Sequence, residues 1–334
     1  MNKIRNAGLI INPAAGQGFA ANAELARRSL SALHIHRVHT GQDQLGATAL
    51  KDLACELSVY PVQPEASRLQ TLDLARQLAA QALDAVLVVG GDGTLADVAV
   101  VFSGIRNAPP LLGIGAGSTN AGALITCPGS QVDRLDPDHL EVVPMNGLLA
   151  SMDGESIGVG FNDCVLGFSV VATINGRLRD ADVAEKLFQR NVPGKPRPIG
   201  LPSTQVKKIG PGGKEQIATG ESVGTVIIGL AERAFIAKAI TGGVCLASFA
   251  GLLAGCLVAD QPLVRVELSA SQTLALPPIH SSYASLSEDE QVQVSGVREG
   301  TAVCIDGNPL RLLTSHDVVS FQVRQGIIRA FKSS

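Results

Sequence analysis

Apolar runs that end in glycine-rich turns recur along the first half of the chain. Residues 7–11, 84–89 and 110–114 are almost continuously apolar, which is typical of strands that are buried on both faces of a parallel sheet. Helical apolar patterns follow the first two runs, at residues 20–33 and 95–102. Strand and helix therefore alternate, and the pattern predicts an α/β domain with a parallel, doubly wound sheet.

Three further segments complete this domain. Residues 33–39 alternate between apolar and polar side chains, so we expect a strand there, and helices are expected over residues 45–57 and 65–83. His34 and His36 share one face of that strand, whereas the third histidine of the segment points to the other face. A polar strand face explains this pattern better than a zinc site, and no metal ligand is assigned.

The second half of the chain has a different pattern. Residues 141–160 indicate two strands joined by an Asp-Gly turn, and residues 306–307 form a second Asp-Gly turn between two apolar runs. From residue 262 onward, apolar and polar side chains alternate with turn signals between the runs. Helices are expected near residues 178–190 and 237–257. This half is therefore predicted to be mainly β, as a sandwich.

These patterns divide the chain into two domains. An α/β domain is expected over residues 1–130 and a mainly β domain over residues 131–334, whose last residues can pack back on the first domain. Within the second domain, residues 191–220 contain five lysine or arginine residues against one glutamate. Two interpretations stay open for this segment: a solvated loop, or a lid whose charge suits an anionic ligand.

Composition and charge restrict the partners. The 334 residues carry a formal net charge of -3, whereas a nucleic-acid binder normally shows a strong basic excess, so any bound polyanion is expected to be small. Residues 240–259 have about the length of a membrane span, but their glycines and alanines favour a buried helix, and no membrane partner is expected. The six cysteines form no CxxC pair, which favours reduced thiols in a cytoplasmic protein.

Three of the predicted strands end in glycine-rich turns suited to phosphate binding. The turns are residues 12–18, 90–94 and 115–122. Their backbone N–H groups can cradle an anion, and a helix that starts there adds the positive end of its dipole. Such turns at the carboxyl ends of strands in one open sheet indicate a shared ligand crevice. Asp92 places one carboxylate where the phosphates would bind.

The polar residues of these turns have structural interpretations as well. Thr94 is expected to cap the helix over residues 95–102, and Ser118 and Thr119 are placed to cap another helix. Asn120 offers both a donor and an acceptor. Asp92 could equally serve only to cap its helix and fix the turn. The chain contains neither GxxxxGK[ST] nor GxGxxG, which excludes a Walker-type site and a dinucleotide fingerprint.

These motifs resemble those of the superfamily of NAD kinases and diacylglycerol or sphingosine kinases. Residues 90–94 match its GGDGT signature, and residues 12–18 resemble its opening NPxxGxG loop. Residues 117–120 resemble its later glycine, threonine and asparagine element, and residues 161–165 resemble the Asn-Glu/Asp motif of NAD kinases. The resemblance covers nearly the whole chain. Within the superfamily it is strongest to the acetoin-catabolism protein X branch, described as NAD kinase-like.

The resemblance implies an N-terminal α/β domain, a C-terminal β-sandwich, a nucleotide crevice between them and a homo-oligomer. It also implies ATP as the phosphoryl donor, with Mg²⁺ carried by the nucleotide, and NAD as the leading acceptor through its ribose 2′-OH. Asp92 would then approach the accepting hydroxyl, Asn162 and Asp163 would bind the ribose, and Asn120 would lie near the adenine or phosphates. The phosphate-binding residues would be Asn12, Gly16, Gly18, Gly90, Gly91, Gly93, Thr94, Gly117, Ser118 and Thr119.

Two departures from the resemblance keep other functions open. The TPTGSTAY segment of NAD kinases is missing, and residues 240–244 retain only its threonine and glycine character. Ala96 and Asp97 stand where many lipid kinases have Asn-Glu. The alternatives are therefore a kinase of another small hydroxylated metabolite and a non-catalytic nucleotide-binding sensor.

Overall fold

The computed structural model describes residues 4–63, 67–117, 120, 122–175, 177–231 and 250–333. The chain divides into two compact units. Unit 1 consists of Met1–Asn146 with Gly326–Ser334, and unit 2 consists of Gly147–Gln325. Residues 131–146 stay with unit 1, beyond the expected boundary at residue 130, because Val132 and Leu135 are buried in its core.

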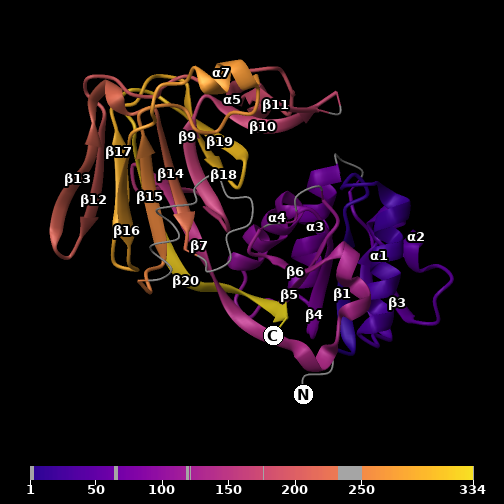
Figure 1. Ribbon diagram of the computed structural model, residues 1–334. Coiled ribbons are helices and arrows are strands. Elements are labelled where there is room, and N and C mark those ends of the chain that lie inside the picture. Colours follow the sequence, from indigo (N-terminus) through magenta and orange to yellow (C-terminus); the bar gives the residue numbers. More distant parts are fainter. Residues whose placement is uncertain are drawn as a thin grey trace. The chain divides into compact units, whose positions relative to one another are not determined.

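Unit 1 is built on a parallel sheet with strands in the order β3, β2, β1, β4, β5. α1 and α2 cover one face, and α3 and α4 cover the other (Figure 1). The predicted doubly wound α/β sheet is confirmed. Its elements are β1 (Asn6–Ile11), α1 (Phe19–Ala32), β2 (Arg37–Gly41), α2 (Ala47–Leu50), β3 (Glu56–Tyr60), α3 (Ser67–Ala79), β4 (Ala85–Gly90), α4 (Asp92–Ser103), β5 (Leu111–Gly115) and β6 (Ile125–Pro128), with short 3₁₀ helices at Asp43–Leu45, Gly129–Arg134 and Pro137–His139.

The strand expected over residues 33–39 begins only at Arg37. α1 ends in a Schellman turn, in which the N–H of His34 donates to the carbonyl oxygen of Ser31 (3.1 Å) and the N–H of Ile35 donates to that of Leu30 (3.0 Å). His34 has a φ of 54° at the position where glycine is usual. The first residues of the expected strand therefore belong to this turn instead.

The helix expected over residues 45–57 forms only at Ala47–Leu50, and the expectation is wrong over residues 56–57. α2 ends at Leu50, and residues 56–60 form the edge strand β3, which pairs in parallel with β2 from Arg37↔Glu56 to Gly41↔Tyr60. Residues 56–60 form a strand because they pair with β2. The helix-like periodicity of the sequence gives no sign of this pairing.

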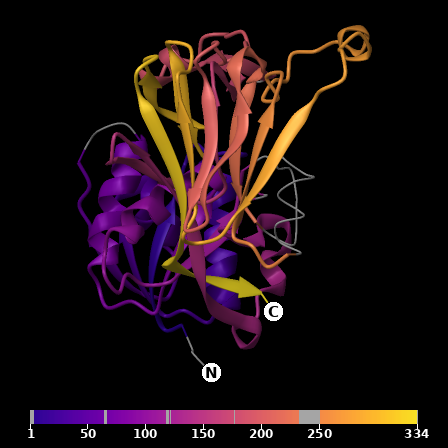
Figure 2. The ribbon, with the colours of Figure 1, turned by 90° about the vertical axis from the view of Figure 1, so that its left-hand side faces the viewer.

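Unit 2 is a sandwich of two antiparallel sheets, as predicted. One sheet has the order β13, β12, β17, β20, with β7 and β8 continuing beside β20, and the other has the order β16, β15, β14, β9, β18, β19. Figure 2 shows these long strands side by side. Leu148, Val206 and Phe321 of the first sheet share one core with Ile228 and Val303 of the second.

The elements of unit 2 include both predicted Asp-Gly hairpins. Asp153 and Gly154 have φ values of 51° and 88°, and Asp306 and Gly307 have values of 47° and 77°, as type I′ turns require. The strands and helices are β7 (Leu140–Met152), β8 (Glu155–Gly160), β9 (Asp163–Gly167), β10 (Ser169–Ile174), β11 (Arg177–Asp182), α5 (Val183–Leu187), β12 (Gln205–Gly210), β13 (Gly213–Thr219), β14 (Thr225–Leu230), β15 (Ala254–Ala259), α7 (Ala270–Leu274), β16 (Ser281–Leu286), β17 (Gln291–Ser295), β18 (Thr301–Ile305), β19 (Asn308–Leu313) and β20 (Val318–Ser333).

Three expectations for unit 2 are corrected. The helix expected near residues 178–190 is mostly the end of β11 followed by the short α5. The helix expected to end at Leu257 is wrong over residues 254–257, which belong to β15, and residues 232–249 lie outside the described residues. The basic segment is neither a loop nor a lid over residues 205–219, because β12 and β13 form a hairpin whose β12 pairs with β17.

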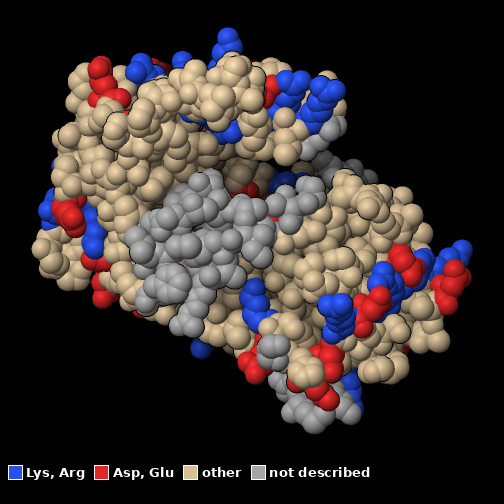
Figure 3. All heavy atoms as spheres, viewed as in Figure 1, with Lys and Arg blue, Asp and Glu red and all other residues tan. Residues whose placement is uncertain are grey.

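The described cysteines are free thiols, as the sequence predicts. Burial raises the pKa of Cys256 and of Cys304 to about 12, so both stay protonated and inert. Cys245 lies outside the described residues. No helix among the described residues is long and apolar enough to cross a membrane. On the face of unit 1 that Figure 3 shows, acidic and basic side chains are interspersed, unlike the continuous basic surface of a nucleic-acid binder.

Thr126 fastens the C-terminal strand to the sheet of unit 1. Its buried Oγ1 accepts the N–H of Gly113 on β5 (3.0 Å) and donates to the carbonyl oxygen of Phe331 on β20 (2.8 Å). One hydroxyl therefore satisfies two backbone groups that belong to different strands.

Thr126→Val should lower the free energy of unfolding by about 1–3 kcal/mol, because valine keeps the shape but leaves two buried backbone groups unpaired. Urea unfolding followed by circular dichroism measures this loss. Thr126→Ser is the matched control, since it keeps the hydroxyl and removes only a methyl group. Equal unfolding midpoints for the two variants would show that the hydroxyl does not hold the strands together.

Candidate functional site

Three loops meet at the carboxyl ends of β1, β4 and β5, which are neighbours in the sheet. A Cβ on Gly16 of the first loop would lie 1.8 Å from the carbonyl oxygen of Ala116 in the third loop, and Gly16 has a φ of 53°. A Cβ on Gly117 would lie 2.8 Å from the Cα of Gly91 in the second loop. Only glycine fits at these contacts, so the loops touch through their backbones.

Asn12 fastens the first loop to the second. Its backbone N–H donates to the carbonyl oxygen of Val89 (2.9 Å), and its Nδ2 donates to Oγ1 of Thr94 (2.7 Å). Its Oδ1 accepts the N–H of Ala14 (3.0 Å). Buried Asn22 donates from Nδ2 to the carbonyl oxygen of Asn12 (2.8 Å). Both the nitrogen and the oxygen of the Asn12 side chain are hydrogen-bonded to other residues. Asn12, which was predicted to bind phosphate, therefore also holds the two loops together.

The N-terminus of α4 opens at the second loop. Asp92 is the first helical residue and Gly91 is the N-cap, and within the described residues no side chain forms a capping hydrogen bond. Thr94, which we expected to cap the helix, is instead its third residue, and its hydroxyl accepts the hydrogen bond from Asn12. This helix end can bind an anion through backbone N–H groups and the helix dipole.

Gly93 has no role that the fold explains. It is exposed in the first turn of α4, and a Cβ there would meet nothing within 4 Å among the described residues. Alanine would favour the helix by about 0.5–1 kcal/mol at such a position. Gly16 and Gly117, by contrast, are required by close backbone contacts. A ligand that approaches the backbone closely would require a glycine at position 93, and the variant below tests this.

Asp92 connects the second loop to the third. Its Oδ1 accepts the N–H of Gly122 (2.9 Å), so the orientation of the carboxylate is fixed at the helix N-terminus. Asn120 closes the third loop: its Oδ1 accepts the N–H of Gly117 and its Nδ2 donates to the carbonyl oxygen of the same residue, both at 2.7 Å. Asn120 thus has a structural role in the loop, in addition to its predicted contact with substrate.

The remaining predicted phosphate ligands are placed differently. Gly18 is the N-cap of α1, with a φ of 87°. Ser118 and Thr119, including their predicted role as helix caps, lie outside the described residues. The structure brings nine predicted residues together in unit 1: Asn12, Gly16, Gly90, Gly91, Asp92, Gly93, Thr94, Gly117 and Asn120.

Asn162 and Asp163 lie in unit 2, at the start of β9. The carboxylate of Asp306 accepts the N–H groups of Phe161 and Asn162, each at 2.7 Å, and that of Asp163 at 3.1 Å. Oδ1 of Asn162 is buried and has no hydrogen-bond partner within the described part of the chain. A buried acceptor without a donor costs free energy, so this oxygen is a candidate ligand for a hydroxyl or amine.

Sequence analysis missed Asp306 as a site residue. The Asp-Gly pattern predicts its hairpin turn, but nothing in the sequence indicates that the turn folds against residues 161–163. Within the described residues, no group of three or more His, Cys, Asp or Glu side chains could hold a metal ion.

Comparisons with known proteins match both the N-terminal segment and the fold. Residues 6–135, which contain all three loops, match the family model of the diacylglycerol kinase catalytic domain. An uncharacterized protein of Archaeoglobus fulgidus is 27% identical over 330 residues, which are 97% of each chain. A putative diacylglycerol kinase from Bacillus anthracis strain Sterne has a TM-score of 0.57 at 16% identity, over 99% of each chain. Yeast NADH kinase complexed with NADH has a TM-score of 0.54 at 13% identity, over 100% of this chain and 84% of that one.

Gly93→Ala should separate ligand contact from folding. In the free protein the added methyl group enters open space, so the free energy of unfolding should stay the same or rise by up to about 1 kcal/mol. Binding of ADP should weaken by about tenfold or more, because the methyl group occupies the approach of a phosphate to the backbone. Titration calorimetry with ADP and thermal unfolding measure the two effects.

Gly16→Ala is the matched control for this variant. Its Cβ would collide with the carbonyl oxygen of Ala116 at 1.8 Å, so stability and ADP binding should fall together. If Gly93→Ala binds ADP as tightly as the parent does, no ligand approaches the backbone at this position.

Proposed function

Because the chain belongs to the superfamily of NAD kinase-like and diacylglycerol kinase-like proteins, we propose that it is a phosphotransferase that moves a phosphoryl group from ATP to a hydroxyl group. Its kinase-like catalytic domain covers residues 6–135. One observation carries the proposal: three glycine loops touch around the open N-terminus of α4, and Asp92 is the first residue of that helix.

The loops have the features that phosphoryl transfer requires of a protein. The reaction depends on positioning and on neutralising the charge of the phosphates rather than on covalent help. Gly93 leaves the backbone accessible beside a helix N-terminus, and the contact between Gly91 and Gly117 holds the second and third loops together there. The proposed triphosphate would bind to backbone N–H groups of this cradle. ATP would bring Mg²⁺, which supplies further neutralisation of charge.

Asp92 is proposed to take the proton of the accepting hydroxyl. A positioned carboxylate performs this step in other phosphotransferases, and the hydrogen bond from Gly122 orients the Asp92 side chain. The competing interpretation is that Asp92 only joins two loops. The two interpretations differ in their consequences, because asparagine can accept the same hydrogen bond from Gly122 but cannot take a proton.

The proposed acceptor is the ribose 2′-OH of NAD, with Asn162 and Asp163 as its ligands. The buried Oδ1 of Asn162 needs a donor, and a ribose hydroxyl is one. Asp163 stands beside it with a carboxylate, and Asp306 fixes the backbone of both residues. The match to a diacylglycerol kinase domain makes a diacylglycerol the second acceptor to test, followed by other small hydroxylated metabolites.

An acceptor assay with γ-³²P-labelled ATP and Mg²⁺ tests the function. NAD, NADH and diacylglycerol in detergent micelles are supplied in separate reactions, and labelled product is counted. Labelled NADP supports the proposal, whereas labelled phosphatidic acid would identify a lipid kinase instead. Tight ATP binding without consumption across these acceptors and a wider panel of hydroxylated metabolites would identify a nucleotide sensor and contradict the transferase.

Asp92→Asn should abolish most of the turnover while the fold persists. Asparagine keeps the size of the side chain and the oxygen that accepts from Gly122, so the melting temperature should match that of the parent. Loss of the proton acceptor should lower kcat by about 10²–10⁴-fold, or about 3–5 kcal/mol in barrier height. Removal of a negative charge near the phosphates should leave ATP affinity unchanged or raise it.

Asp133→Asn is the control for the charge change, because it removes an exposed carboxylate of unit 1 that pairs with Arg28. Its kcat should stay within about twofold of the parent, since exposed ion pairs contribute little. Turnover by Asp92→Asn at a similar level would show that Asp92 is not the base.

Asp163→Ala should raise the KM for the acceptor by about tenfold or more, the loss expected for a charge-assisted hydrogen bond to a hydroxyl. The backbone N–H that donates to Asp306 is retained, so the turn at residues 161–163 should persist. The KM for ATP serves as the internal reference and should not change. Steady-state kinetics measure both constants, and an unchanged acceptor KM would overturn the ribose assignment.

A further inference from the structure

Unit 1 contains a cavity of about 790 Å³ at the amino edge of its parallel sheet. The first residues of three strands line it, namely Asn6 of β1, Arg37 of β2 and Glu56 of β3, together with His34 at the end of α1. Parallel strands place their amino ends at the opposite edge from their carboxyl ends. The cavity is therefore separated from the three glycine loops by the length of the strands.

Most charged groups around the cavity are already paired. Arg37 binds Glu56 through Nε at 2.8 Å. The carboxylate of Asp136 accepts the backbone N–H of Asp138 (2.9 Å) and contacts Nδ1 of His139 (3.0 Å), and these contacts hold the pKa of Asp136 below its usual value.

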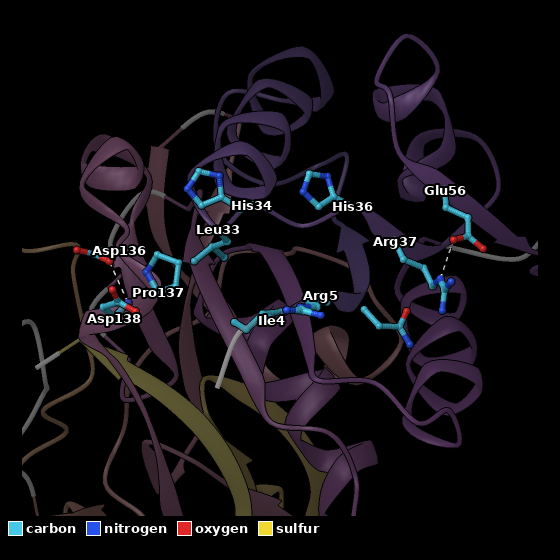
Figure 4. Close-up of a pocket in the computed structure, with 11 residues that line it drawn as sticks. Ile4, Arg5, Leu33, His34, His36, Arg37, Glu56, Asp136, Pro137 and Asp138 are labelled. Carbon is cyan, nitrogen blue, oxygen red and sulfur yellow. Dashed lines mark hydrogen bonds and ion pairs between the residues drawn. The ribbon is translucent and has the colours of Figure 1, made fainter. Parts of the chain in front are cut away.

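Two opposite charges remain without an ion-pair partner in the described part of the chain: the guanidinium of Arg5 and the carboxylate of Asp138. In Figure 4 they lie on either side of Ile4, with the ring of His36 above Arg5 and that of His34 above Leu33. Ile4 and Leu33, which are buried, provide the apolar wall.

One further feature of the lining calls for a ligand. The side-chain Nδ2 of Asn6 donates to the carbonyl oxygen of Ala82 (3.1 Å), which fixes the amide orientation, because a carbonyl can only accept. The Oδ1 of Asn6 is buried with no partner among the described residues.

We propose that this cavity is a second binding site, which takes a small zwitterion whose carboxylate and ammonium groups are joined by a short apolar chain. The carboxylate pairs with Arg5, the ammonium group pairs with Asp138, and the apolar chain spans the interval between them. A polyphosphate does not suit this cavity, because its charged lining consists of two arginines and three carboxylates. The volume lies within the usual range of small-molecule sites, about 300–1,000 Å³.

Titration calorimetry on the full-length protein with a graded series of probes tests this site. The series is 4-aminobutyrate, 6-aminohexanoate and 8-aminooctanoate, and hexanoate and hexylamine are the analogues that lack one charge. At least one zwitterion should bind about two- to fivefold more tightly than both analogues, which is the loss expected for one contact with an exposed charge. The chain length that binds best reports the separation of the two charged groups.

Arg5→Gln and Asp138→Asn should each weaken binding of the best probe by about two- to fivefold, because both side chains are exposed, while ADP binding stays unchanged. Arg177→Gln, which removes an exposed arginine of unit 2, is the matched control and should bind the probe as the parent does. Thermal unfolding confirms that each variant folds. The proposal is overturned if no zwitterion binds at 10 mM, if a singly charged analogue binds equally well, or if both variants bind like the parent.

Discussion

Backbone contact between three loops is the constraint on which the candidate site depends. β1, β4 and β5 lie side by side and end at one edge of the sheet, so their loops must share a small volume. Because Gly16 and Gly117 have no Cβ, the loops can touch through their backbones. Two hydrogen bonds, from Asn12 to Thr94 and from Gly122 to Asp92, hold the loops in this contact. These hydrogen bonds lie within and between the loops, and Gly91 stands at the N-cap of α4.

A strand can be predicted from the sequence where its own residues, rather than a distant partner, decide that it forms. Residues 84–89 are apolar because both faces of β4 are buried, and both Asp-Gly hairpins are predictable because their turns require positive φ. Residues 205–219 and 56–60 behave differently. Lysine, glutamine and glycine in the first segment indicate a loop, yet β12 pairs with residues 291–295. Partners so distant in sequence leave no local signal.

At the site, too, the sequence predicts which residues are present but not which contacts each of them makes. Sequence motifs place Asn12, Thr94 and Asn120 at the site, but each forms hydrogen bonds within the loops that no spacing rule predicts. Thr94 is not a cap because the helix starts two residues earlier, at Asp92. The sequence does not indicate Asp306, because the three N–H groups that donate to its carboxylate lie far away in the chain, at residues 161–163. Motifs identify chemistry, whereas tertiary contacts decide which groups remain available for a ligand.

The two edges of the unit 1 sheet present different chemistry for a physical reason. At the carboxyl edge, glycine turns and a helix N-terminus offer backbone N–H groups with almost no side-chain charge, which suits phosphates. At the amino edge, strands begin with side chains such as Arg5 and Arg37, and neighbouring strands supply Glu56 in register. A ligand at the amino edge must therefore carry charges that match individual side chains, whereas an anion at the carboxyl edge interacts with a helix dipole. The proposed nucleotide site and the proposed zwitterion site thus lie at opposite edges of one sheet and depend on different groups.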